Sequence, residues 1–138
     1  MADRIYAQKV TSTGAGRDGH VKGEGGIDFD VRPPKAGTGV NPESLFAAAW
    51  AACFNGALRK MMEDAGVDTE KFSPEVDAEV ALNNDPSGVG FRLSGVVTAR
   101  FANQDELDNA EELVAKAHDF CPFSKAVRGE FDAEAKLG

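Results

Sequence analysis

The stretch that decides the fold is NPESLFAAAWAACFNGALRKMMEDAG, residues 41–66. Asn41 suits an N-cap, Pro42 suits the first helical position, and Glu43 suits the positive end of a helix dipole. These residues predict a helix that ends just before the glycine that closes the stretch. Residues 45–54 are apolar almost all round, and a helix without a polar face must be covered on every side. We therefore expect this helix to lie at the centre of the fold.

Alternating apolar and polar residues on both sides of this helix predict β-strands. The segments with this pattern are residues 6–10 (the weakest), 27–31, 76–82, 91–101 and 131–137. Residues 84–88 have the composition of a turn, so the third and fourth segments are expected to pair as an antiparallel hairpin.

A second helix is predicted after the hairpin. Residues 103–106 resemble a capping box at its start, and Pro122 is expected to stop or redirect it. Its buried face is given by apolar residues spaced by three and four: Leu107, Ala110, Val114, Ala117 and Cys121.

This order of strands, helix, hairpin, helix and strand predicts an α+β fold with a mainly antiparallel sheet. A length of 138 residues favours a single domain, residues 1–138. So short a chain has only a modest core of its own. The apolar central helix therefore suggests that a second subunit supplies part of its cover.

Composition excludes several classes of function. The chain has 15 Lys and Arg against 23 Asp and Glu, a net charge of −8, which argues against binding to nucleic acid or to an anionic membrane surface. The longest apolar run has ten residues, about half of the roughly 20 that span a bilayer. The first residues lack a signal peptide's apolar core. We expect a cytoplasmic protein whose cysteines form no permanent disulfide.

Sequence motifs for bound cofactors are absent: the chain has no phosphate-binding glycine loop, no GxGxxG and no CxxC. No bound cofactor or metal is expected, because the spacing of the four potential zinc ligands matches no common pattern. These four residues are His20, Cys53, His118 and Cys121.

The two cysteines carry the remaining chemistry. Cys53 lies on the apolar helix, where desolvation raises the pKa of a thiol and leaves it inert unless a cation is near. Arg17 is a candidate cation, because it lies in a glycine-rich loop that can approach another element closely. Cys121 lies where the helical periodicity breaks, just before Pro122. The alternative is that both cysteines are small core hydrophobes.

Three motifs resemble the Ohr/OsmC family of organic hydroperoxide reductases. Residues 41–54 resemble its first cysteine motif, residues 121–129 (CPFSKAVRG) its second, and residues 16–19 (GRDG) the arginine loop of the Ohr branch. With the element order, the resemblance covers essentially the whole chain. Lys125 and the alanines before Trp50 are closer to the OsmC branch.

The resemblance implies an intertwined homodimer with the central apolar helix buried inside it. It also implies a thiol peroxidase that reduces alkyl or lipid hydroperoxides to alcohols in an oxidative stress response. Cys53 would be the peroxidatic cysteine, Cys121 the resolving one, and Arg17 and Glu43 the polar pair that sets the thiolate. The implied reductant is an external dithiol, such as dihydrolipoamide or a lipoylated protein.

Helix geometry separates two of these residues. Glu43 and Cys53 are ten residues apart, or about 15 Å along one straight helix. Either Arg17 spans this gap or the Glu43 near Cys53 belongs to a second subunit, and we favour the second arrangement, with the two apolar helices antiparallel. An apolar substrate pocket could be lined by Phe46, Trp50, Phe54 and Met61, although each also suits core packing.

Three other functions fit the same residues. The first is an OsmC-type peroxidase with a different reductant. The second is a redox-sensing or hydrophobic-ligand-binding dimer, whose cysteines would react once rather than turn over. The third is a structural dimer with inert cysteines.

Overall fold

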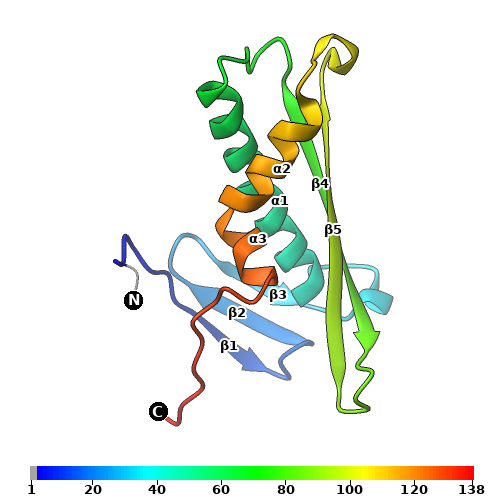
Figure 1. Cartoon of the computed structure of the whole chain (residues 1–138). Helices are drawn as coiled ribbons and strands as arrows, with labels where there is room; N and C mark the ends of the chain where they lie inside the picture. The colour runs from blue at the N-terminus through cyan, green and yellow to red at the C-terminus, as the bar shows by residue number, and fades with distance from the viewer. Residues whose placement is uncertain (1–2) are drawn as a thin grey trace. The chain divides into compact units, whose positions relative to one another are not determined.

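The computed structural model describes residues 3–138. The chain divides into two compact units, one ending at Leu45 and the other beginning at Phe46. The long helix α1, Pro42–Asp64, starts in the first unit and continues into the second (Figure 1). Within residues 3–138 no helix combines the length and the apolar character needed to cross a bilayer.

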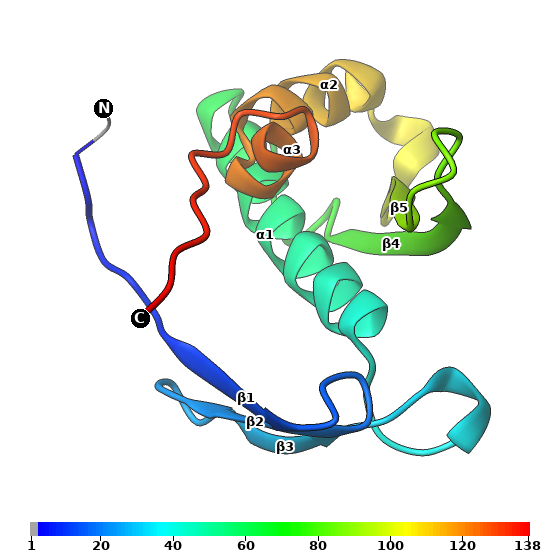
Figure 2. The same ribbon diagram turned by 90° about the horizontal axis from the view of Figure 1, so that it is seen from below.

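The first unit is a three-stranded antiparallel sheet in the order β1-β2-β3 (Figure 2). Paired residues on one face are polar, His20 with Asp30, and paired residues on the other are apolar, Val21 with Phe29. The short 3-10 helix η1, Pro34–Ala36, and a bridge between Val31 and Val40 lead the chain to α1. The strands are β1, Val10–Gly14; β2, Gly19–Gly23; and β3, Asp28–Val31.

Helix α1 has the ends that its sequence predicts. The Asn41 Oδ1 accepts a hydrogen bond from the Ser44 N–H, and the Asn41 N–H donates to Ser44 Oγ, both at 2.9 Å. This reciprocal pair is a capping box in which a serine takes the usual place of Glu or Gln. At the other end the Val67 N–H donates to the Met62 carbonyl, and Gly66 adopts a left-handed conformation with φ 73°. This is the Schellman arrangement that glycine permits.

The second unit packs α1 between a hairpin and two shorter helices (Figure 1). The hairpin pairs β4, Pro74–Asn84, with β5, Phe91–Phe101, over eleven residues of each strand. Helix α2, Ala110–Phe120, is followed by α3, Pro122–Val127. The buried core joins one face of α1 to α2: Trp50, Phe54, Leu58, Met62, Leu113, Ala117 and Cys121. The expected α+β class with antiparallel strands is confirmed.

The expected start of the second helix was wrong. Asn103 makes no capping hydrogen bond and takes a left-handed backbone conformation, φ 54°. Its side-chain amide instead donates to the Lys71 carbonyl at 2.9 Å. Residues 104–106 form the 3-10 helix η2, Gln104–Glu106, and α2 begins at Ala110. The tertiary contact of Asn103 replaces the local cap.

Two expected strands also differ. Residues 131–137 form no strand, and Phe131 and Leu137 are 69% and 98% exposed. The alternation of apolar and polar residues indicates only that one face of the segment is suited to burial. A strand also needs a neighbouring strand for its backbone hydrogen bonds. Among the described residues no strand pairs with this segment. The expected strand at residues 6–10 begins only at Val10. Strand β2 was not predicted, because Val21 is the only apolar side chain between its terminal glycines.

One side of α1 stays uncovered in the single chain. Ser44, Ala48, Ala52 and Gly56, spaced by four residues, are exposed, and such spacing places them along one side of the helix. The complete cover expected for the apolar turns is therefore not provided by residues 3–138 alone. Further exposed apolar side chains lie on the hairpin, at Leu82, Val89, Phe91, Leu93 and Val96.

Candidate functional site

The structure brings Cys53 and Cys121 together. Cys53 lies on α1 and is partly buried, and Cys121 joins α2 to α3 and is fully buried. Both are free thiols, and they lie close enough for Cys121 to influence the pKa of Cys53. Pro122 ends α2 as predicted, so Cys121 has an extended backbone between two helices and its sulfur faces α1.

Burial is the largest influence on the Cys53 thiol, and it raises the pKa of that group. The Phe123 N–H, which donates a hydrogen bond to the sulfur, lowers the pKa, and the contact with Cys121 raises it. The net result in the single chain is a raised pKa. None of these influences is a cation, and a raised pKa leaves a smaller fraction of the group as the nucleophilic thiolate near neutral pH.

The structure also brings Arg17 and Glu43 together. Arg17 lies in the turn between β1 and β2, and Glu43 lies in the first turn of α1, both in the first unit. The Arg17 Nη2 donates to Glu43 Oε1 in an ion pair. The Glu43 side chain is 15% exposed, whereas that of Arg17 is 53% exposed. The guanidinium is therefore oriented by its partner while much of it stays available to other groups.

The two pairs are separate along α1. Glu43 lies in the first turn of the helix, and Cys53 follows ten residues later, or about 15 Å along the axis. Glu43 therefore cannot contact the sulfur on its own helix.

An apolar cavity of about 560 Å³ lies in the second unit, between residues of α1, the hairpin and α3. Phe123, whose N–H donates to the Cys53 sulfur, is one of its lining residues. Of the expected pocket residues, Phe46 and Trp50 line it. Phe54 is fully buried, and Met61 packs against the core. The lining also includes Val80, Leu93, Ala126, Val127 and Phe131.

Sequence reasoning missed one polar contact near the cysteines. The Trp50 Nε1 donates a hydrogen bond of 3.1 Å to Ser124 Oγ, and both side chains are buried. The available signal was the position of Ser124, three residues after Cys121, within the second cysteine motif.

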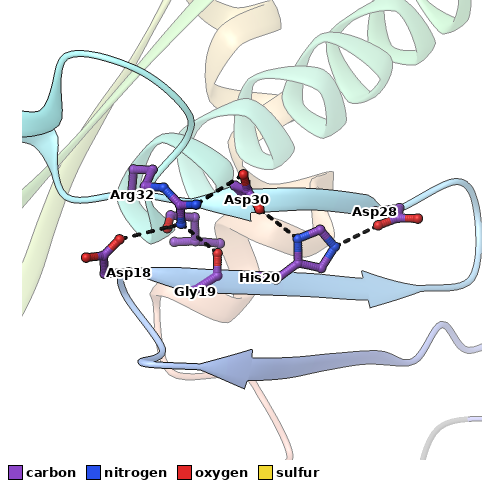
Figure 3. Close-up of polar contacts among 7 residues, drawn as sticks. Asp18, Gly19, His20, Asp28, Asp30 and Arg32 are labelled. Atoms are coloured by element: carbon purple, nitrogen blue, oxygen red, sulfur yellow. Dashed lines mark hydrogen bonds and ion pairs between the residues drawn. The ribbon is translucent and has the colours of Figure 1, made fainter.

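A second polar cluster lies on the sheet of the first unit (Figure 3). His20 on β2 lies between two carboxylates of β3: its Nδ1 is 2.9 Å from Asp30 Oδ1, and its Nε2 is 2.7 Å from Asp28 Oδ1. Arg32 pairs with Asp30 at 3.1 Å and with Asp18 at 3.5 Å. Both ring nitrogens of His20 are thus occupied, and no group of three or more potential ligands among residues 3–138 could hold a metal ion.

Comparisons with known proteins define the class. The family model for OsmC-like protein matches residues 35–136. The chain is 39% identical over 138 residues to the organic hydroperoxide resistance protein OhrB of Bacillus subtilis, covering 96% of this chain and 98% of that protein. It is 43% identical over 136 residues to the organic hydroperoxide resistance protein-like 1 of Staphylococcus epidermidis, covering 96% and 94%.

A solved structure agrees with this similarity. The crystal structure of OhrB from Bacillus subtilis superposes with a TM-score of 0.81 at 40% identity, covering 94% of this chain and 96% of that one. This chain belongs to the OsmC-like family, and its relatives include organic hydroperoxide resistance proteins. The shared name supports a role in resistance to organic hydroperoxides.

The His20 cluster gives a prediction for pH dependence. The hydrogen bonds that the His20 ring donates to Asp30 and then to Asp28 raise the pKa of His20, and the bond accepted from His20 lowers the pKa of Asp30. NMR titration of the His20 ring should give a pKa above the ordinary value of 6.5, and Asp30→Asn should lower it. Because the folded-state pKa is raised, the stabilisation by protonated His20 is complete below about pH 6.5. It is lost as pH rises through the folded pKa.

The Asp30 contribution has the opposite sign, since its pKa is lowered: it is present above the ordinary carboxyl value and is lost as pH falls through the folded pKa. A His20 pKa at or below 6.5 that Asp30→Asn leaves unchanged would contradict this arrangement. Asp77→Asn, on β4 in the second unit, is the control that should leave His20 unaffected.

Proposed function

We propose that this protein is a cysteine-based peroxidase that reduces organic hydroperoxides to alcohols in a reducing cytoplasm. The observation that carries the proposal is the pair of neighbouring free thiols, Cys53 and Cys121, in a chain of this family. The match to the family model crosses the boundary between the two units, which supports treating residues 1–138 as one functional domain.

The chemistry needs no bound cofactor. The Cys53 thiolate attacks the O–O bond of the hydroperoxide, the sulfur is oxidised to a sulfenic acid, and the alkoxide leaves and takes a proton to become the alcohol. Cys121 then attacks the sulfenic sulfur, which forms the Cys53–Cys121 disulfide and releases water. An external dithiol, such as a lipoyl group, reduces this disulfide by exchange.

Activation of Cys53 requires a positive charge. Arg17 suits this role because a guanidinium stays protonated even when it is desolvated. Glu43 orients it through the ion pair. In our proposal the Arg17–Glu43 pair of one subunit acts on Cys53 of the other, since Glu43 lies too far from Cys53 along α1.

The chain exposes a surface to which a second subunit could bind. The exposed stripe of small residues on α1, Ser44 to Gly56, allows close approach of another helix, and the hairpin exposes large apolar side chains. Exposed apolar surface of this kind is typical of interaction sites. We propose a homodimer in which α1 helices pack antiparallel across a twofold axis.

The apolar cavity supports a proposal about the preferred substrate. A space of about 560 Å³ lined by Phe46, Trp50 and Phe123 suits an alkyl or lipid chain, whereas hydrogen peroxide gains nothing from apolar walls. We therefore propose that organic hydroperoxides react faster than hydrogen peroxide.

Intact mass and turnover test the proposed activity. After one equivalent of cumene hydroperoxide, the wild type should lose about 2 Da as the disulfide forms, and Cys121→Ser should gain about 16 Da as a sulfenic acid. With excess dihydrolipoamide, the wild type should consume hydroperoxide continuously. A single stoichiometric oxidation would instead indicate a redox sensor. No reaction of either thiol would indicate inert core cysteines and would end the proposal.

Mixed dimers test the sharing of residues between subunits. A dimer of one Cys53→Ser subunit and one Glu43→Ala subunit should keep one intact site, and so about half of the wild-type activity, because the wild-type Cys53 meets the wild-type Glu43 of its partner. If both residues acted within one subunit, this dimer would be inactive. A dimer of Cys53→Ser with Glu63→Ala, a change at the opposite end of α1, should give half activity in either case and calibrates the assay.

A further inference from the structure

We propose that the hydrogen bond between Trp50 and Ser124 is a positioning device that holds Cys121 against Cys53. Trp50 and Ser124 act through the position of another group, so they are positioning residues. The inference deepens the proposed function, but it concerns the proximity of two thiols and can be tested without a peroxide.

Two contacts join α1 to the segment that follows α2, and they are in register. Trp50 precedes Cys53 by three residues on α1, and Ser124 follows Cys121 by three residues. Residues three apart are neighbours on one side of a helix. The Trp50–Ser124 bond therefore lies about one turn from the Cys53–Cys121 contact, and the two segments run antiparallel at this point.

The Trp50 end of the bond is fixed by its surroundings. The side chain is 4% exposed, and its ring lies against Gly95 of β5. A Cβ at Gly95 would be only 2.8 Å from Trp50 Cζ3 and 2.9 Å from the Glu79 carbonyl oxygen. The ring thus occupies space that any other residue at position 95 would fill. An indole held in this way presents its N–H in one direction.

The Ser124 end fixes a segment that has few other polar ties to α1. Ser124 is 0% exposed and lies in the first turn of the six-residue helix α3. The other side-chain tie near α3 comes from Arg128, whose Nη1 donates to the His118 carbonyl at the end of α2. That bond connects α3 to α2. Among the described residues, Trp50–Ser124 is the hydrogen bond between two side chains that connects α3 to α1, and it lies beside the contact of the Phe123 N–H with the Cys53 sulfur.

Two features of the thiol pair depend on this connection. The first is the position of Cys121, which must reach the Cys53 sulfur in the resolving step. The second is the Phe123 N–H, which donates to Cys53 and lies between Cys121 and Ser124 in the chain. Because the rate and equilibrium of an intramolecular step depend on how well the reacting groups are held together, loss of the bond should lower the effective concentration of Cys121 at Cys53.

The test measures the Cys53–Cys121 disulfide equilibrium against reduced and oxidised glutathione. This equilibrium gives the effective concentration of the two thiols directly and involves no hydroperoxide. Ser124→Ala and Trp50→Phe should each lower the effective concentration about fivefold, the factor that corresponds to one buried hydrogen bond of roughly 1 kcal/mol. The double variant should fall no further than the lower single variant, because both changes remove the same bond.

Met62→Ala is the control for a general loss of packing. Met62 is fully buried on the same helix, nine residues beyond Cys53, so its truncation weakens the core without touching the Trp50–Ser124 bond. Its effective concentration should stay within twofold of the wild type although its melting temperature falls. An equal loss in Met62→Ala, additive losses in the double variant, or an unchanged value in Ser124→Ala would each overturn the positioning role.

A kinetic measurement separates this inference from the proposed function. After a pulse of cumene hydroperoxide, Ser124→Ala should form the disulfide about fivefold more slowly than the wild type and accumulate more sulfinic acid. If the wild type does not react with hydroperoxide while the glutathione result holds, the peroxidase proposal fails and the positioning role stands. If the wild type turns over while Ser124→Ala keeps the wild-type effective concentration, the positioning role fails alone.

Discussion

Packing of the apolar side of α1 partly buries the Cys53 sulfur, and this burial raises the pKa of the thiol. The same packing supplies the core, through Trp50, Phe54, Leu58 and Met62. The burial of α1 that stabilises the fold therefore also disfavours the reactive thiolate form of Cys53. The N–H of Phe123 offsets part of the cost of a thiolate, and an external positive charge must offset the rest. We propose that the Arg17 guanidinium supplies this charge, and because Glu43 and Cys53 lie far apart along α1, the proposed site includes a second subunit.

The break between α2 and α3 is the second condition for the chemistry. Pro122 ends one helix and begins the next, so that Cys121 has an extended backbone and its sulfur reaches α1. A continuous helix would carry the residues after Cys121 away from Cys53. The short helix α3 then returns Phe123 to the sulfur and Ser124 to the indole of Trp50. In the proposed mechanism, residues 121–124 therefore supply the resolving thiol, a hydrogen bond to the thiolate and the tether to Trp50.

The sequence predicted correctly those features that depend on residues close together in the chain. The ends of α1 follow from Asn41 and Gly66, and the hairpin follows from alternation around a turn. The start of α2 was missed because Asn103 bonds to the distant Lys71 carbonyl. Residues 131–137 have the pattern of a strand without a neighbour in this chain. The Trp50–Ser124 bond joins residues 74 apart, and neither side chain shows from sequence alone that it is buried and paired.

The most direct measurement is the pKa of Cys53 in the assembled protein, read from the pH dependence of its alkylation rate in a Cys121→Ser background. We predict a value below that of an ordinary thiol, a rise of at least one unit in Arg17→Gln, and no change in Arg100→Gln, whose guanidinium pairs with Asp77. An ordinary or raised pKa that Arg17→Gln does not alter would contradict the role of the guanidinium and, with it, the proposed activation of the thiol.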